Sequence, residues 1–281
     1  MIESVVVDED GIDIHLSRWD PAGDARGVVQ LLHGRAEHAG RYARLAGALT
    51  ASGFVVYADD HRGHGRTGLA TGGLGMMGPG GQDGVLAGVR AVARHITSEQ
   101  AGLPVVMLGH SWGSFIAQRY LPRWGAELAG LVLTGTTDRD HRPDPPVVGG
   151  PNAAFADPRT DYDWLSRDDA EVDAYIADPW CGFDAVAAID AEDGTVTAAS
   201  IPPASRSNIP PALPILIMNG DADPIGGGAG GRSLAERYRS MGLADVELLV
   251  YPDARHELFN ELNRDQVTSD LLRWLDRVLP R

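Results

Sequence analysis

Short apolar runs rich in β-branched residues recur along the chain, and each predicts a strand. The runs cover residues 27–34, 54–60, 104–110, 130–136, 213–220 and 246–253. A near-continuous apolar run is typical of a strand buried on both faces, as in a parallel sheet covered by helices. Residues 1–16 alternate apolar and polar positions instead, which also predicts a strand.

A helical period appears between these runs. Residues 41–51, 83–95 and 267–278 each place apolar side chains three and four positions apart, so that these side chains share one face of a helix. Strands that alternate with helices in this way favour a doubly wound α/β sheet.

The alternation stops between residues 138 and 209. Proline-rich sequence marks both ends of this segment, and six of its residues are aromatic: Phe155, Tyr162, Trp164, Tyr175, Trp180 and Phe183. The segment holds 15 acidic and 5 basic residues, so it carries a net charge of −10 out of −15 for the whole chain. We therefore predict a core formed by residues 1–137 and 210–281, with residues 138–209 inserted as an acidic cap.

Composition narrows the class of protein. A chain of 281 residues with 43% hydrophobic and 22% charged residues is long enough for one α/β domain with an inserted subdomain. The negative net charge disfavours nucleic acid and anionic membranes as partners, and no stretch approaches the roughly 20 apolar residues that span a bilayer. The single cysteine, Cys181, and a start without the pattern of a secretory signal predict a cytoplasmic protein. Nothing in the sequence indicates a protein partner.

One serine stands in a sequence that favours nucleophilic chemistry. Residues 109–113, GHSWG, fit the pattern G-x-S-x-G, which alone is weak in a chain with 35 glycines. Here a predicted strand runs directly into the pattern and a helical period follows it. In that setting the glycines permit a sharp turn with the serine at its apex. Ser111 is therefore predicted to be a nucleophile.

A serine nucleophile needs a base and an acid that orients the base. His256 follows the last predicted strand, where a loop can return its imidazole to the carboxyl edge of the sheet. Asp221 and Asp223 follow the preceding strand, and the spacing does not choose between them. The histidines of the N-terminal part match no zinc-ligand spacing, so no metal is expected.

Ester chemistry at a serine also needs two backbone N–H groups that stabilise an oxyanion. One is expected from Trp112, the residue after the nucleophile. The other is expected from Arg35, in the loop after the strand at 27–34, where Gly34 lets the chain turn close to a substrate.

Five blocks of sequence, in this order, resemble the monoacylglycerol lipase and lysophospholipase branch of the α/β-hydrolase fold, which is grouped with the serine aminopeptidases. They are HGRAEHAGRY (33–42), DHRGHGRT (60–67), GHSWG (109–113), GDADPI (220–225) and YPDARHELFNE (251–261). The resemblance covers nearly all of the chain except the predicted cap. It implies a mostly parallel, eight-stranded sheet flanked by helices, with a cap inserted after the sixth strand.

The resemblance implies a cofactor-free serine carboxyl-ester hydrolase. Such an enzyme would act through an acyl-enzyme on monoacylglycerols, lysophospholipids or similar small esters. The blocks map the nucleophile, acid and base to Ser111, Asp223 and His256, and they map the oxyanion donors to Arg35 and Trp112.

The resemblance also implies roles for Glu37 and Arg41, either near the polar end of the substrate or in support of the oxyanion loop. A purely structural ion pair is the alternative.

The chain departs from the family pattern at Trp112 and Ser114, where Met and Gly are usual. We hypothesise that the indole narrows the acyl pocket. Because lids that dock on lipid usually expose an apolar face, the acidic cap favours dissolved monomeric esters over interfacial activation.

Two further readings stay open. A serine aminopeptidase-like peptidase would use the acidic cap to hold the α-amino group of its substrate, and cleavage confined to aminoacyl-anilides would identify it. A non-catalytic sensor would bind a small ligand on a hydrolase fold, with a reactive serine but no turnover. A haloperoxidase-like side activity is also compatible with such a triad.

Overall fold

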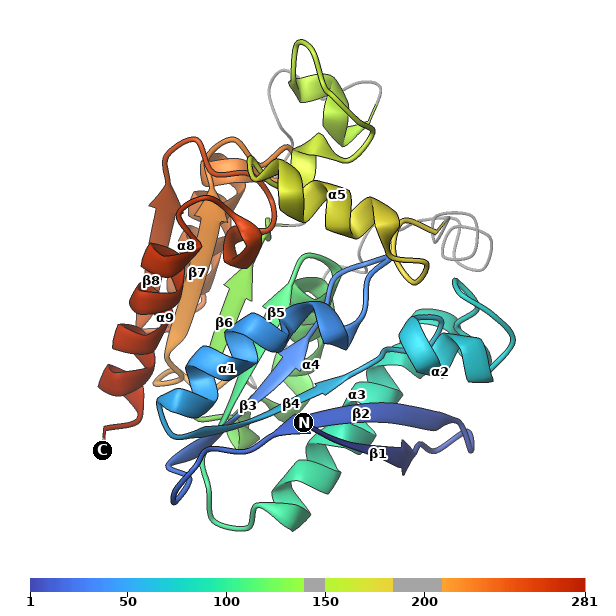
Figure 1. Ribbon diagram of the computed structural model, residues 1–281. Helices are drawn as coiled ribbons and strands as arrows, with labels where there is room; N and C mark the ends of the chain where they lie inside the picture. The colour runs from blue at the N-terminus through green and yellow to red at the C-terminus, as the bar shows by residue number, and fades with distance from the viewer. Residues whose placement is uncertain (139–149, 184–208, 281) are drawn as a thin grey trace.

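Eight strands form one mostly parallel sheet in the computed structural model, which describes residues 1–138, 150–183 and 209–280 (Figure 1). The strands are β1 Ile2–Val7, β2 Asp13–Trp19, β3 Gly27–Leu32, β4 Phe54–Asp59, β5 Val105–His110, β6 Gly130–Thr134, β7 Ile215–Gly220 and β8 Val246–Tyr251. Their order is β1-β2-β4-β3-β5-β6-β7-β8, in which β2 is antiparallel to both neighbours and the other pairs are parallel. All six apolar runs form strands, and the predicted α/β sheet is confirmed.

The strands at the two edges of the sheet differ from the strands that the sequence pattern predicts. The N-terminal stretch forms two strands, β1 and β2, because a turn interrupts it after Asp8. Gly11 lies in that turn with φ 79°, and its N–H donates to the Asp8 carbonyl oxygen at 3.0 Å. At the opposite edge, most of β8 is only half-buried despite its apolar run. The reason is that β8 is an edge strand with one neighbouring strand, β7.

Helices cover both faces of the sheet (Figure 1). Met107 packs in one apolar cluster with α3, α4 and α8, and its neighbour Leu108 packs in another with α1 and α9. This two-sided burial is the reason why the strands form continuous apolar runs. The helices are α1 Ala43–Ala51, α2 Gly65–Ala70, α3 Gly81–Glu99, α4 Trp112–Trp124, α8 Gly227–Ser240 and α9 Arg264–Val278, with 3₁₀ turns η1 Ala39–Tyr42, η2 Gly125–Glu127 and η5 Leu258–Asn260.

Residues 150–183, here called the cap segment, lie between β6 and β7 in the chain and over the carboxyl edge of the sheet (Figure 1). Arginine–carboxylate pairs connect this segment to the region after β8. Arg167 donates to Glu261 at 2.8 Å, and Arg264 donates to Asp168 at 2.7 Å. The segment contains η3 Pro151–Ala154, η4 Asp163–Leu165 and α5 Asp169–Ala177. The rest of the predicted cap, including most of both proline-rich ends, lies outside the described residues.

The parallel strands direct the candidate chemistry to one place. The loops after β3, β5, β7 and β8 all begin at the carboxyl edge, beneath the cap segment, where open α/β sheets bind their ligands. Within the described ranges, no helix combines the length and apolar character that crossing a membrane requires.

Candidate active site

Ser111 occupies a sharp turn between β5 and α4. Its backbone has φ 51° and ψ −120°, a conformation that a serine rarely adopts. The two glycines of the pentapeptide are required by close packing. A Cβ on Gly109 would lie 2.6 Å from the carbonyl oxygen of Gly113, and a Cβ on Gly113 would lie 2.2 Å from the carbonyl oxygen of Leu32. The structure therefore places the serine at the apex that the sequence predicts.

His256 and Asp223 meet from two adjacent loops. Asp223 Oδ2 lies 2.9 Å from His256 Nδ1, both side chains are buried, and Asp223 Oδ1 accepts the N–H of Ile225 at 2.9 Å. Asp221 is exposed, and its carboxylate accepts the N–H of Asp253 at 2.6 Å. The structure thus pairs the histidine with Asp223, while Asp221 stabilises a neighbouring turn.

The second nitrogen of His256 is available for proton transfer. His256 Nε2 is buried and has no hydrogen-bond partner among the described residues, and His256 and Ser111 line the same cavity. Burial lowers the pKa of His256, but the charge and hydrogen bond of Asp223, together with the charges of Glu257 and Glu37, outweigh burial, so the pKa is raised. His110, with its ring 4.8 Å from that of His256, has its pKa lowered to about 4 by burial and by the charge of His256.

The loop after β3 lies against Ser111. A Cβ on Gly34 would lie 2.7 Å from Glu37 Oε1 and 3.2 Å from Ser111 Cβ, so only glycine fits this approach. Arg35, the next residue, lines the cavity together with Trp112. Because Trp112 is the first residue of α4, its N–H has no acceptor within the helix. We call residues 33–42 the oxyanion loop.

A buried ion network underlies the oxyanion loop. Glu37 Oε1 accepts the N–H of Gly34 at 2.5 Å and the hydroxyl of Tyr42 at 2.7 Å. Arg41 donates to Glu37 at 2.7 Å and makes two bonds to Glu257, at 2.6 and 2.8 Å. Burial opposes ionisation of Glu257, but Arg41 outweighs it and lowers the pKa of that carboxyl to about 2. Glu37 therefore holds the N–H of Gly34, and Arg41 holds Glu37, an arrangement compatible with support of the loop and with a purely structural ion pair.

The indole of Trp112 packs against buried histidines. Its ring stacks on that of His64 at 4.9 Å and stands edge-on to His61 at 5.7 Å. His33 donates from Nδ1 to the carbonyl oxygen of Gly34 at 2.7 Å and accepts the N–H of His61 at its Nε2 at 3.0 Å, which fixes a neutral tautomer. Burial and the neighbouring imidazoles lower the pKa of His33, so this ring is uncharged near neutral pH.

The cavity above Ser111 has a volume of about 440 Å³. Four of the six aromatic residues of the predicted cap line it, and Phe155 and Trp180 are not among the lining residues. Arg41 is also absent from the described lining, whereas Glu37 and Glu257 contribute to it. The four aromatic residues are Tyr162, Trp164, Tyr175 and Phe183.

Glu257 was not recognised from the sequence. It directly follows His256, and an acidic residue in a loop after a strand is usually exposed to solvent. Its function in the network depends on Arg41, which lies far away in the chain, so no local pattern identifies it. Four hydrogen bonds, counting those from Arg41 and Asn260, hold charged groups in this buried site.

An eight-stranded, mostly parallel sheet with a serine at a strand–turn–helix junction places the protein among the α/β-hydrolases. The model of the family described as serine aminopeptidase, S33, matches residues 23–263. A monoacylglycerol lipase of Mycolicibacterium smegmatis is 35% identical over 273 residues, which cover 94% of this chain and 93% of that protein. The human monoglyceride lipase is 29% identical over 274 residues, covering 92% and 84%.

A solved structure extends the likeness to the whole chain. The thermostable carboxyl esterase of Bacillus coagulans superimposes with a TM-score of 0.86 at 26% identity, covering 99% of this chain and 98% of that one. The chain belongs to the serine aminopeptidase S33 family, and it is a carboxylic ester hydrolase that uses a serine.

Proposed function

We propose that Ser111, His256 and Asp223 are the catalytic triad of this ester hydrolase. The observation that carries the proposal is the buried hydrogen bond of 2.9 Å between Asp223 Oδ2 and His256 Nδ1, beside the cavity that Ser111 lines. Because Asp223 accepts the Nδ1 proton, the lone pair of the neutral imidazole lies on Nε2. That nitrogen is the base for the Ser111 hydroxyl.

The reaction proceeds through an acyl-enzyme. Ser111 Oγ attacks the ester carbonyl carbon while its proton passes to His256 Nε2. The bond to the alcohol then breaks, and the imidazolium returns the proton to the leaving oxygen. A water molecule that His256 deprotonates releases the acid and restores Ser111. The N–H groups of Arg35 and Trp112 hold the oxyanion, and loss of one such donor costs about 3 kcal/mol of transition-state stabilisation.

Small hydroxylated esters of the monoacylglycerol type fit this cavity best. Its walls include the apolar side chains of Phe115, Phe183 and Ile225, and its polar part includes the carboxylates of Glu37 and Glu257. Alcohol hydroxyls can donate to the lone pairs of these carboxylates that Arg41 leaves open. The names of the relatives in Mycolicibacterium smegmatis and human support the same substrate class.

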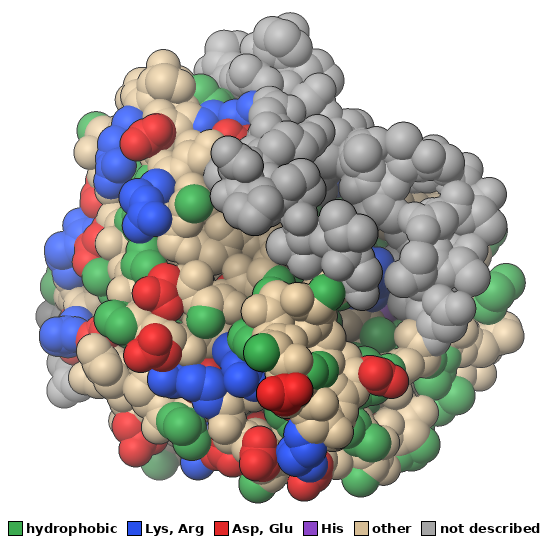
Figure 2. All heavy atoms as spheres, turned by 90° about the horizontal axis from the view of Figure 1, so that it is seen from above, with side chains coloured by type: hydrophobic (Ala, Val, Ile, Leu, Met, Phe, Trp, Pro, Cys, Tyr) green, Lys and Arg blue, Asp and Glu red, His purple; other side chains and the backbone are tan. Residues whose placement is uncertain are grey.

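We also propose that residues 138–209 form the cap and that the enzyme acts on dissolved monomers. Of the large apolar side chains exposed in the described residues, only Ile176 belongs to the cap segment. Figure 2 looks down on this side of the molecule and shows acidic and basic side chains interspersed on the described surface. Such a surface offers little to a lipid aggregate. The lone free cysteine, Cys181, supports a cytoplasmic location.

The peptidase reading is less well supported. It requires a free carboxylate for the α-amino group of a substrate. Glu37 and Glu257 line the cavity, but both are bonded to Arg41. The lining residues from the described cap segment include no acidic side chain, so an ammonium group would find no unpaired partner there.

A substrate panel tests the proposal. Initial rates are measured on glycerol monoesters and p-nitrophenyl esters from acetyl to palmitoyl, a lysophospholipid and aminoacyl-anilides. Monoesters are expected to be the best substrates, and Ser111→Ala is expected to lower their turnover by about 10⁶-fold. Cleavage confined to anilides would assign the site to a peptidase, and covalent labelling of Ser111 without turnover would indicate a sensor.

The same panel tests the pocket. Trp112→Ala keeps the backbone N–H but removes the indole, so we expect the preferred acyl chain to lengthen. An unchanged preference for acyl-chain length would refute the hypothesis that Trp112 narrows the acyl pocket. We expect the initial rate to saturate as the concentration of monomeric substrate increases. A sudden rise of the rate above the critical micelle concentration of the substrate would contradict the preference for dissolved esters.

A further inference from the structure

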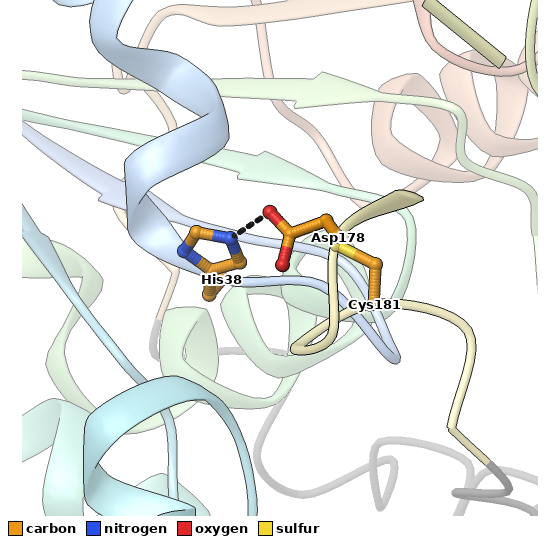
Figure 3. A group of neighbouring side chains, drawn as sticks. All are labelled: His38, Asp178 and Cys181. Atoms are coloured by element: carbon orange, nitrogen blue, oxygen red, sulfur yellow. Dashed lines mark hydrogen bonds and ion pairs between the residues drawn. The ribbon is translucent and has the colours of Figure 1, made fainter. Parts of the chain in front are cut away.

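Three side chains with metal-binding atoms meet outside the cavity, where the cap segment contacts the oxyanion loop. They are His38, Asp178 and Cys181, and Figure 3 shows them directed toward one another. One ligand atom of each lies within 4.8 Å of the other two, and His38 Nε2 is 2.9 Å from Asp178 Oδ2. All three are half-buried, which leaves the group accessible to an ion. In the described parts of the chain this is the only such group.

Each segment positions its ligands by local hydrogen bonds. Asp178 and Cys181 share one turn after α5, where the Cys181 N–H donates to the Asp178 carbonyl oxygen at 3.0 Å. The N–H of Trp180 donates to Asp178 Oδ1 at 2.8 Å, so the other carboxylate oxygen is directed toward His38. The D-x-x-C spacing of this turn equals the short C-x-x-C spacing of many zinc sites. His38 packs edge-on against Trp180 at 5.2 Å.

The surrounding charges favour a cation. Asp178 belongs to the group itself, and the nearby Arg41 guanidinium is already paired with the carboxylates of Glu37 and Glu257. Three carboxylates thus outnumber one guanidinium in this region. A divalent cation beside the Cys181 sulfur would offset that excess of negative charge.

We propose that His38, Asp178 and Cys181 bind one divalent cation of the zinc class, with water as the fourth ligand. Imidazole, carboxylate and thiolate are the donors that zinc takes, and its bonds of about 2.0–2.3 Å place ligand atoms roughly 3.3–3.8 Å apart. Small side-chain rotations bring the three atoms to that separation.

The existing hydrogen bonds define where each proton goes when the cation binds. Cys181 releases its thiol proton to solvent when Sγ binds the cation. His38 Nδ1 accepts the N–H of Gly40 at 3.2 Å, so the ring proton lies on Nε2 and faces Asp178. Binding through Nε2 moves that proton to Nδ1 and gives up the bond from Gly40. The cation therefore replaces the His38–Asp178 hydrogen bond with a stronger link between cap segment and core.

This link would act on the oxyanion loop itself, to which His38 belongs. His38 directly follows Glu37, whose carboxylate holds the N–H of Gly34. Gly182 directly follows Cys181 and donates to the carbonyl oxygen of Ala36 at 3.0 Å. An ion that binds only the folded chain also raises its unfolding temperature.

Metal titration of the full, metal-free chain tests the site. Zn²⁺ competed against a chromophoric chelator is expected to bind with one equivalent per chain and to raise the unfolding temperature. Co²⁺ is expected to produce the charge-transfer absorption of thiolate coordination. Cys181→Ser should abolish that absorption, and Cys181→Ser and His38→Gln should each weaken Zn²⁺ binding at least about tenfold.

His95→Gln is the matched control, because His95 pairs with Glu99 on α3, away from the group. It is expected to bind Zn²⁺ like the unaltered chain. Zn²⁺ binding of unchanged affinity in the Cys181 and His38 variants, or Co²⁺ binding without charge-transfer absorption, would overturn the proposal. If a variant fails to fold, the Co²⁺ spectrum of the unaltered chain decides the question, since it is independent of any substitution.

Discussion

Ser111 and His256 are held ready by contacts that their immediate neighbours provide. The backbone of Ser111 has a positive φ of 51°. The side chain of His256 is oriented by its hydrogen bond to Asp223, with 2.9 Å between Nδ1 and Oδ2. Strain and burial of this kind persist only where the surrounding structure imposes them, and they are frequent at reactive sites. The two aspartates after β7 provide a direct comparison, because Asp221 and Asp223 are only two residues apart but differ in burial and partner.

Asp223→Asn is predicted to lower kcat on a soluble ester by about 10⁴-fold, because an amide no longer selects the Nδ1–H tautomer. The proposed base, His256, must be neutral to accept the Ser111 proton, so activity is expected to rise as the pH passes the pKa of His256. In the unaltered enzyme Asp223 raises this pKa, which puts the acidic limb of kcat/KM above about pH 6.5. In the variant burial still lowers the pKa, so the limb moves to lower pH.

Asp221→Asn is the control for this prediction. Its carboxylate is exposed and accepts only a turn N–H in the described structure, so its pH profile is expected to match that of the unaltered enzyme. If Asp221→Asn lost activity and Asp223→Asn kept it, the acid would have to be reassigned.

The junction between β5 and α4 requires the start of α4 to lie very close to the backbone at the end of β3. Gly113 lies in the first turn of α4, directly against the end of β3. A Cβ at this position would lie 2.2 Å from the Leu32 carbonyl oxygen and 2.5 Å from that of His33. Backbone atoms cannot rotate away as a flexible side chain can, so α4 would have to move.

Gly113→Ala is therefore predicted to destabilise the fold by about 3 kcal/mol, the upper range for overpacking, and to displace the N–H of Trp112. Urea unfolding measures the change. Gly47→Ala in α1 is the matched control, since nothing lies within 4 Å of its Cβ position. It should be neutral or stabilise the helix by up to about 1 kcal/mol. Equal effects of the two substitutions would contradict the close-packing argument.

Across the whole molecule, buried titratable groups make stability depend on pH. Burial lowers the pKa of His64 to about 3 and, with His256, that of His110 to about 4. The unfolded chain takes up protons at these histidines near pH 6.5, so it binds more protons than the folded chain below that pH, and stability falls. Glu257, with a pKa of about 2, adds stability above about pH 4.5 that is lost as the pH falls toward 2. The raised pKa of His256 acts in the opposite direction.

We predict that the free energy of unfolding falls between pH 7 and pH 4.5, with His110 alone contributing roughly 2–3 kcal/mol over that range. Urea midpoints at the two pH values measure this fall. His64→Gln should flatten the dependence, whereas His95→Gln at the half-exposed pair with Glu99 should leave it unchanged. A midpoint that is independent of pH would count against the neutral, buried histidines.

Features that depend only on neighbouring residues could be predicted from the sequence. The six apolar runs predict β3 to β8 because a strand covered on both faces needs apolar side chains throughout. The pentapeptide around Ser111 predicts its turn because Gly109 packs against Gly113 within the same five residues. The fold class and the serine ester hydrolase follow from these local patterns and from the resemblance they carry.

Contacts between residues far apart in the chain became known from the folded structure. Spacing left Asp221 and Asp223 equivalent until one of them was found bonded to His256. The ion network of Arg41 and Glu257 and the grouping of His38 with Cys181 join residues that are far apart in the chain. Contacts of this kind arise when separate strands and loops converge on one edge of the sheet, and no periodicity along the chain records them.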